Sequence, residues 1–397
     1  MDITADTSLA RESKSGALFT WSWIVDAKTD LVWITGGGWT GLFLLLLILL
    51  GADPMGVWFA WVTLVDTPHF IGTYTRTYFD PEVWKRQPFF LLASLGWLLA
   101  GPAVLGLCYL LYRLGVHQYT LPWGLFVGGF LVWAYMHIVR QHWGVFALYR
   151  RKESGPLSRW ADFGEKWLLH AVLGFPALAF ILVHPQMSRE LGLRKAGEPA
   201  LYSTDVLLVI CWGLALVFWV HQAWRTWQAQ RAGRSVNAVK LLFAVLVTAY
   251  TAFITSSPWV TAAPIVVFMM LTTVHHDVQY DAVVWHYHRR RQARGNLLHG
   301  LAGWMTRNLG TFLFSGILIA AAFRFLGCKV EIHEGCIPMF TTSKSPLFGS
   351  MTLRDLLVAV FLGFPLNHYW IDQFIWRPSQ DARLASDLGV GDKSSQA

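Results

Sequence analysis

The sequence predicts an all-α protein, a polytopic bundle of about ten membrane-spanning helices with both termini in the cytoplasm. Of the 397 residues, 54% are hydrophobic and only 14% are charged, whereas a typical soluble domain has about 25% charged residues. The apolar residues also form long blocks, and a block of about 18 residues or more predicts a transmembrane helix. A helix satisfies its own backbone hydrogen bonds in lipid, and the short alternating segments typical of a β-barrel are not seen in the sequence.

The expected elements follow in chain order. Residues 1–30 comprise a polar cytoplasmic tail and, over 17–30, an aromatic, amphipathic segment that we expect to be an interfacial helix. The membrane domain then covers residues 31–373. Its spans are predicted near 31–50, 55–75, 88–112, 121–148, 162–184, 201–223, 238–256, 258–283, 302–325 and 352–373. Residues 374–397 are polar and are predicted to form a disordered cytoplasmic tail.

Lysine and arginine are distributed unevenly between the two sets of loops, and this bias predicts the orientation. The richer set includes Lys85 with Arg86, residues 150–152 and residues 289–291, and we assign it to the cytoplasmic side of a bacterial inner membrane. Because the formal charge of +8 is spread over these loops, it does not indicate nucleic-acid binding. Cys328 and Cys336 flank a loop on the outer side, where an oxidising compartment favours a disulfide, with two free thiols as the alternative.

Ionisable residues inside a membrane span are costly and therefore mark candidate functional sites. They occur in four predicted spans, all even-numbered. These residues are Asp66 and His69; His137, Arg140 and His142; His275, His276 and Asp277; and His368 and Asp372. Even-numbered spans run from outside to inside in this topology, and each cluster lies late in its span. We therefore expect the clusters to share a depth near the cytoplasmic side and to converge on one buried site.

Imidazole and carboxylate groups together are ligands of iron and zinc. The predicted metal ligands are His69, His137, His142, His275, His276, His368, Asp66 and Asp372. This number exceeds the four ligands of one tetrahedral ion, which favours two ions. The predicted catalytic residues are Asp66, Asp277, Asp372 and Arg140. The acids either bind metal or hold the far nitrogen of a ligating histidine.

The spacing of His137 and His142 leaves two possibilities open. Residues five apart project about 140° from each other on an ideal helix. The two imidazoles would therefore share one site only if the helix were distorted, or each would serve a different ion. Arg140 lies between them and is placed either to counter an acid or to bind an anionic head group.

The segment HIVRQH at 137–142 and the pair His275-His276 resemble the histidine boxes of integral-membrane non-haem iron oxygenases, such as desaturases, hydroxylases and alkane monooxygenases. A full HXXHH box is not present, and ten spans exceed the number usual in that class. The architecture is also similar to that of the Brp/Blh-type carotene-cleaving membrane enzymes. The resemblance implies iron, dioxygen, a lipid or isoprenoid-like substrate from the bilayer and, for some of these reactions, an electron donor.

These observations together predict a membrane-embedded metalloenzyme, a non-haem (di-)iron oxygenase that hydroxylates, desaturates or cleaves a lipid-soluble substrate. Three alternatives remain open. A zinc-dependent hydrolase would use the same ligands to activate water, and a membrane cytochrome would use histidine pairs as axial ligands of haem. An ion transporter would need a path of ionisable groups across the membrane, and the outer halves of the predicted spans have almost none.

Overall fold

The computed structural model describes residues 18–153, 159–185, 204–294, 300–330 and 345–390. The all-α prediction is confirmed, since helices make up most of this part of the chain. The α-helices are α1 (Ala27–Thr29), α2 (Gly38–Leu49), α3 (Pro54–Trp61), α4 (Thr67–Arg76), α5 (Pro81–Arg86), α6 (Pro88–Ser94), α7 (Ala100–Arg113), α8 (Leu121–Arg150), α9 (Arg159–Val183), α11 (Thr204–Arg231), α12 (Ala238–Ser256), α13 (Pro258–Ala262), α14 (Ile265–Ala293), α15 (Gly300–Met305), α16 (Leu309–Val330), α17 (Leu353–Ile375) and α18 (Ala382–Asp387).

Three tighter or wider turns and four short strands complete the described elements. The turns η2 (Asp30–Ile34) and η3 (Val62–Asp66) are π-helical, and η4 (Leu95–Leu99) is a 3-10 turn. The strands are β1 (Phe19–Thr20), β2 (Val236–Asn237), β3 (Pro346–Phe348) and β4 (Met351–Thr352). β1 pairs with β2 in parallel, and β3 pairs with β4 in antiparallel orientation.

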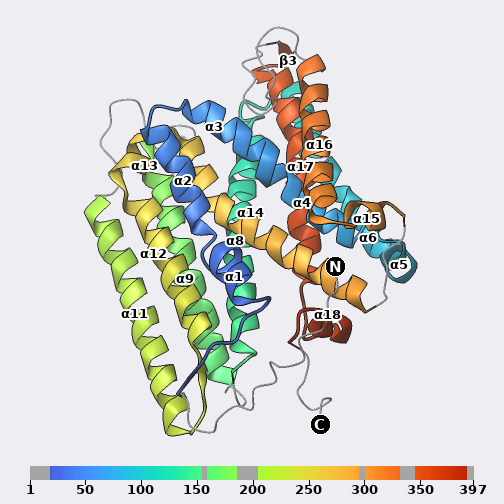
Figure 1. The fold of residues 1–397 in the computed structure, drawn as a ribbon. Coiled ribbons are helices and arrows are strands. Elements are labelled where there is room, and N and C mark those ends of the chain that lie inside the picture. Colours follow the sequence, from blue (N-terminus) through green and yellow to red (C-terminus); the bar gives the residue numbers. More distant parts are fainter. Residues whose placement is uncertain (1–17, 154–158, 186–203, 295–299, 331–344, 391–397) are drawn as a thin grey trace.

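Helix α14 runs through the middle of the bundle, with α9, α11 and α12 on one side and α4, α16 and α17 on the other (Figure 1). It contacts α2, α3, α4, α8 and α12 directly. Its apolar side chains Val267, Met270 and Leu271 are fully buried and belong to the largest hydrophobic core. The polar residues farther along α14 are therefore enclosed by other helices.

The predicted interfacial helix over 17–30 is wrong for residues 18–26, which are extended or irregular. β1 pairs with a segment more than 200 residues away, where Phe19 lies opposite Val236. The Asp30 carboxylate then accepts hydrogen bonds from the backbone N–H groups of Ile24 and Val25, at 2.7 and 3.0 Å. Long-range pairing and this carboxylate together override the helical preference of the segment.

Fewer helices qualify as membrane spans than the ten predicted. Among the described residues, three are long and apolar enough to cross a membrane: Pro88–Arg113, Leu121–Arg150 and Ala238–Ser256. A fourth arises if Ala27–Ile34 and Gly38–Leu49, which meet at a 45° bend, count as one span. Other predicted spans coincide with helices that are interrupted, such as α3 and α4, or that carry many polar residues, such as α14.

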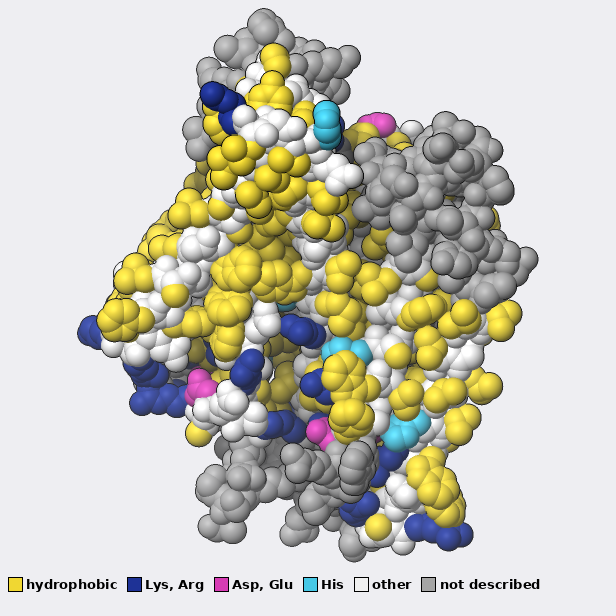
Figure 2. Space-filling view, turned by 180° about the vertical axis from the view of Figure 1, so that it is seen from behind, with side chains coloured by type: hydrophobic (Ala, Val, Ile, Leu, Met, Phe, Trp, Pro, Cys, Tyr) yellow, Lys and Arg dark blue, Asp and Glu magenta, His cyan; other side chains and the backbone are white. Residues whose placement is uncertain are grey.

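Many apolar side chains are exposed on the outer helices, whereas several ionisable side chains are buried inside the bundle. Large apolar side chains are exposed on the outer helices, including Phe43 on α2, Leu125 on α8 and Leu216 on α11. Histidine and aspartate side chains of α4, α14 and α17 are buried instead. Figure 2 shows Lys and Arg gathered mainly in the lower half of one face, with hydrophobic side chains over most of the remainder. Exposed apolar surface of this extent is typical of a membrane or interaction surface.

Part of the tail that is predicted to be disordered, Ala382–Asp387, forms the docked helix α18, and residues 391–397 lie outside the described residues. Leu384 and Leu388 of the α18 segment are each only 1% exposed. Arg294 donates a hydrogen bond to the Ser386 carbonyl at 2.6 Å and pairs with Asp387 at 3.0 Å. These contacts hold α18 against the end of α14.

The predicted Cys328–Cys336 disulfide lies outside the described residues, because residues 331–344 are not described. Cys108 and Cys211 are free thiols within the described part of the chain.

Candidate metal centre

Four helices each bring one imidazole to a common point inside the bundle. The residues are His69 from α4, His137 from α8, His276 from α14 and His368 from α17, and we call them the four-histidine cluster. Ring centroids of neighbours are 4.8 Å apart for His69–His368, 5.1 Å for His69–His276, and 4.9 Å for both His137–His276 and His137–His368. All four side chains are buried, with at most 5% of the residue exposed.

An irregular turn precedes His69. The α-helical path widens into the π-helical turn η3 between Trp61 and Thr67, and Pro68 lies in the first turn of α4, where a missing N–H is tolerated. Gly316 of α16 packs on this proline so closely that a Cβ at Gly316 would lie 2.8 Å from the Pro68 Cβ. π-helical turns occur frequently at functional sites, and this one directly precedes His69 of the cluster and ends at Asp66.

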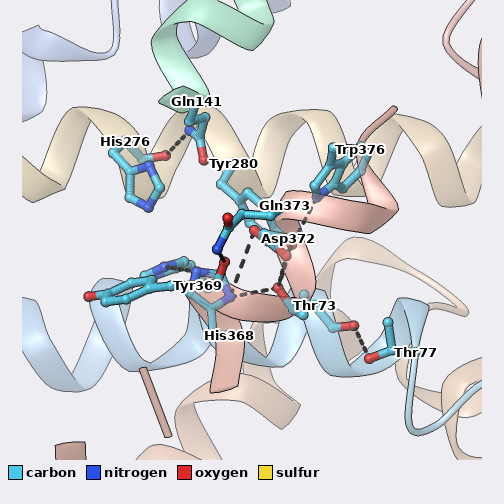
Figure 3. Close-up of polar contacts among 12 residues, drawn as sticks. Thr73, Thr77, Gln141, His276, Tyr280, His368, Tyr369, Asp372, Gln373 and Trp376 are labelled. Atoms are coloured by element: carbon cyan, nitrogen blue, oxygen red, sulfur yellow. Dashed lines mark hydrogen bonds and ion pairs between the residues drawn. The ribbon is translucent and has the colours of Figure 1, made fainter. Parts of the chain in front are cut away.

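Hydrogen bonds fix the orientation and the tautomer of His368. The Thr73 hydroxyl donates to Asp372 Oδ1 at 2.8 Å and lies 2.7 Å from His368 Nδ1 (Figure 3). Because Thr73 has only one hydrogen to donate, it accepts from His368 Nδ1–H. The Tyr280 hydroxyl lies 2.5 Å from the Thr73 hydroxyl oxygen and 3.1 Å from Asp372 Oδ1, and its one hydrogen goes to one of these two acceptors. With Thr73 donating to Asp372, the proton of His368 lies on Nδ1 and a lone pair remains on Nε2.

His69 has a similar arrangement with a carboxylate from another helix. Its Nδ1 lies 3.1 Å from Asp277 Oδ1, although the two atoms are not aligned as a hydrogen bond. The second oxygen of Asp277 accepts from Trp61 Nε1 at 3.2 Å. A carboxylate beside Nδ1 favours a proton on that nitrogen and a lone pair on Nε2. Carboxylate–histidine pairs of this kind orient metal ligands in many proteins.

The spacing inside the cluster fits a bound cation. The Nε2 atoms of His69 and His368 are 3.2 Å apart. With both protons on Nδ1, two lone pairs face each other in a buried site, which is unfavourable unless a cation lies between them. Two nitrogens bound at about 2.1 Å to one ion lie about 3.2 Å apart when the angle at the ion is about 100°. His137 Nε2 and His276 Nδ1 have no hydrogen-bond partner in the described structure, so both are available as ligands.

Three groups of potential ligand atoms, each within 4.8 Å of one another, occur among the described residues. One is His69 with His276 and His368, and the second is His137 with His368 and Asp372. The third is Asp66 with His69 and Asp277. The first and second groups share His368, and the first and third share His69, so the groups are adjacent; none of the three contains all four histidines of the cluster. Asp277 lies beside Nδ1 of His69 at 3.1 Å and Asp372 beside Nδ1 of His368 at 3.8 Å, and Asp66 belongs to the group that contains His69.

The remaining predicted histidines lie together elsewhere. His142 and His275 form a separate pair with ring centroids 5.0 Å apart, and neither belongs to any of the three ligand groups found in the described residues. Because a carbonyl only accepts, His275 Nε2 donates to the Ile34 carbonyl, at 3.3 Å. The pair lines a small cavity with Tyr250, which has room for about one water molecule. α8 is regular between His137 and His142, so the two imidazoles face different neighbours.

Arg140 lies away from the buried cluster. Its guanidinium is exposed and donates to Gln373 Oε1 on α17 at 2.9 Å. The next residue, Gln141, donates to the His276 carbonyl at 2.8 Å, as Figure 3 shows. This second bond links α8 to α14 close to the cluster. Arg140 thus joins two helices that carry cluster residues without contacting the imidazoles.

Sequence reasoning did not identify two residues that contact the site. Thr73 follows His69 by four residues, and Tyr280 follows His276 by four, so each shares a helix face with a cluster histidine. Their hydroxyl oxygens are 2.5 Å apart and both contact Asp372. Extending the i, i+4 search from ionisable residues to hydroxyl groups would have found both.

Comparisons of the chain with protein-family models, with curated proteins and with solved structures give no match. We therefore infer the function from the geometry of the site.

Proposed function

We propose that the protein is a membrane-embedded non-haem iron oxygenase in which the four-histidine cluster holds one iron ion. The observation that carries this proposal is the convergence of four buried imidazoles, with the Nε2 atoms of His69 and His368 3.2 Å apart. Histidine-rich sites with open positions suit non-haem iron. Iron bound there would activate dioxygen. The proposed substrate is a lipid or isoprenoid-like molecule.

One ion fits the described residues better than the two favoured by the histidine count. The group formed by Asp66, His69 and Asp277 shares His69 with the cluster. Ligation of the first ion through His69 Nε2 leaves Nδ1 protonated toward Asp277, so Nδ1 is not available for a second ion. In this proposal Asp277 positions His69, and Asp372 positions His368 through Thr73.

Side chains that can donate and accept protons also lie beside the four-histidine cluster. The Tyr280 hydroxyl lies 3.1 Å from Asp372 Oδ1 and accepts from Trp376 Nε1 at 3.3 Å. Thr73 connects Asp372 to His368. Thr73 contacts the proposed ligand His368 directly, and Asp372 and Tyr280 are next to Thr73. In this proposal the three groups transfer protons as general acids or bases during oxidation of a substrate.

The same geometry bears on the alternatives. Axial histidines of haem lie on opposite faces of a large macrocycle, whereas all four imidazoles here have neighbours with ring centroids 4.8–5.1 Å away. Such spacing leaves no room for a porphyrin between them. Zinc has the same preference for imidazole, so the difference between an oxygenase and a zinc hydrolase lies in the metal and in the need for dioxygen.

The membrane context extends the proposal. The three or four apolar helices support membrane association, and we propose that all ten predicted segments belong to a bundle in a bacterial inner membrane. Both termini and the cluster would then lie toward the cytoplasmic side. A lipid-soluble substrate would enter laterally from the bilayer, and hydroxylation or desaturation would need an electron donor, whereas cleavage by dioxygen would not.

The first test is elemental analysis of purified full-length protein and matched histidine variants. Wild type is expected to contain about one iron per chain, and His137→Gln is expected to lose it, because the variant removes a ligand. His142→Gln is the matched control, on the same helix and equally buried, and is expected to retain iron. Full iron content in His137→Gln, or turnover by iron-free protein without dioxygen, would contradict the proposal.

A further inference from the structure

A second polar cavity lies at the basic end of the bundle, where α8 and α11 end and α12 begins. Its volume is about 200 Å³. The residues around it are Arg150, Arg151, Glu153, Glu165, Arg225, Thr226, Ala229, Arg234, Ser235, Val236 and Lys240. We call it the basic pocket. None of these residues belongs to the four-histidine cluster, and Arg150 follows His137 by thirteen helical residues, or about 20 Å.

Positive charge exceeds negative charge in the basic pocket, since five Arg and Lys side chains accompany two carboxylates. The carboxylates are already paired. Lys240 Nζ lies 2.9 Å from Glu153 and 3.5 Å from Glu165, and Arg150 Nη1 lies 3.3 Å from Glu165. Glu165 is fully buried and Lys240 is 3% exposed, so this ion-pair group forms an ordered, buried part of the wall.

Two of the arginines have no carboxylate partner within the described residues. Arg225 donates from Nη1 to Gln228 at 3.2 Å, and its Nε is buried without a hydrogen-bond partner. Arg151 is exposed at the rim and makes no side-chain ion pair in the same part of the chain. A buried guanidinium N–H without an acceptor is costly, and an anion in the pocket would satisfy it.

We infer that the basic pocket binds a phosphate group, as a phosphomonoester or phosphodiester. The planar guanidinium group matches phosphate oxygens with two parallel N–H donors, which explains the use of several arginines. The volume is below the range of about 300–1,000 Å³ typical of drug-sized ligands, so the pocket suits one small anionic group. Both an anionic lipid headgroup and a soluble phosphate present this chemistry, and the inference does not depend on the proposed oxygenase activity.

The test measures binding to the full-length chain in detergent with two probes. Inorganic phosphate is titrated by calorimetry, and phosphatidylglycerol is compared with phosphatidylcholine by native mass spectrometry. Arg225→Gln is expected to weaken binding at least about tenfold, because it removes a charge-assisted hydrogen-bond donor. If Arg225→Gln weakens the binding of both probes, the pocket is a phosphate site open to soluble ligands. If it weakens the binding of phosphatidylglycerol alone, the pocket is a lipid headgroup site.

Arg289→Gln is the matched control. Arg289 also lies near the C-terminal end of its helix and donates to a glutamine three residues later, Gln292, but it is outside the pocket. This variant is expected to bind both probes like wild type. Equal weakening by both substitutions would show a general surface charge effect and overturn the inference, as would unchanged binding in Arg225→Gln. The thermal stability of each variant checks that the fold is retained.

Discussion

At the scale of single residues, Thr73 connects His368 of the proposed metal site to Asp372 and Tyr280. Its hydroxyl lies within 2.8 Å of polar atoms of Tyr280, His368 and Asp372. The sequence predicted the histidine and the acid because such groups are rare within membrane spans. Threonine is common in helices, so the sequence alone does not single out Thr73. Its role follows from the positions of the surrounding helices.

Replacing Thr73 by valine tests this role, since valine has the same shape without the hydroxyl. The Nδ1–H of His368 would lose its acceptor, and Asp372 would lose a donor. We expect iron affinity to fall about 10- to 100-fold, as for other residues that orient metal ligands. The measurement is competition with an iron chelator, and Thr73→Ser should restore most of the affinity.

A suitable control is Thr248→Val on α12. The Thr248 hydroxyl is also buried, but its bonds are to carbonyls of its own helix, Ala244 at 2.7 Å and Val245 at 3.2 Å. Iron affinity should be unchanged in this variant. Wild-type affinity in Thr73→Val, with iron still bound, would show that Thr73 does not position His368.

At the scale of elements, the long unbroken helices were the most predictable. The apolar run at 238–256 is α12 with the same bounds, and the run at 121–148 is α8 within a few residues. Hydropathy also located the helical path near 55–75, but it could not show the π-helical turn η3 inside it. One extra residue in a turn leaves the overall apolar composition unchanged, although it rotates every later side chain.

Close packing between α7 and α17 positions the helix that carries His368. A Cβ at Gly101 would lie 2.2 Å from the Ala359 carbonyl oxygen, and one at Gly363 would lie 2.7 Å from the Leu98 Cα. Small residues allow two helices to approach closely in this way. The glycines therefore set the distance of α17 from its neighbour.

Gly101→Val is expected to reduce the free energy of unfolding by about 1–3 kcal/mol, because the backbone of Ala359 must move to accept the side chain. Gly106→Val on the same helix is the matched control, since a Cβ there meets no atom within 4 Å. Its stability should stay within about 0.5 kcal/mol of wild type. Unfolding in denaturing detergent measures both, and equal stability of the two variants would contradict the packing account.

At the scale of the whole molecule, the helices could be listed from the sequence but their assembly could not. Helical spacing shows which residues of one helix share a face, and it does not show which faces meet. Helical spacing left open whether His137 and His142 share one site or serve different ions, and the structure pairs the first with His276 and His368 and the second with His275. The N-terminal segment shows the same limit, because its pairing partner β2 is distant in sequence.

The proposed orientation is also a property of the whole molecule. Single cysteines at Val116 and at Ala232, both exposed, would lie on opposite sides of the membrane in this topology. In a background with the native cysteines replaced by serine, a membrane-impermeant maleimide added to intact cells should label Val116→Cys only. Labelling of Ala232→Cys alone would reverse the orientation, and labelling of both would contradict a membrane-spanning arrangement.

The central claim is that four imidazoles from four helices bind one iron ion. X-ray absorption spectroscopy at the iron edge tests it most directly, because the spectrum reports the number of nitrogen ligands and the outer-ring scattering of imidazole. We predict scattering from about four imidazoles in wild-type protein, and fewer in His276→Gln. A spectrum without imidazole scattering, or one that is unchanged in His276→Gln with iron fully bound, would contradict the account.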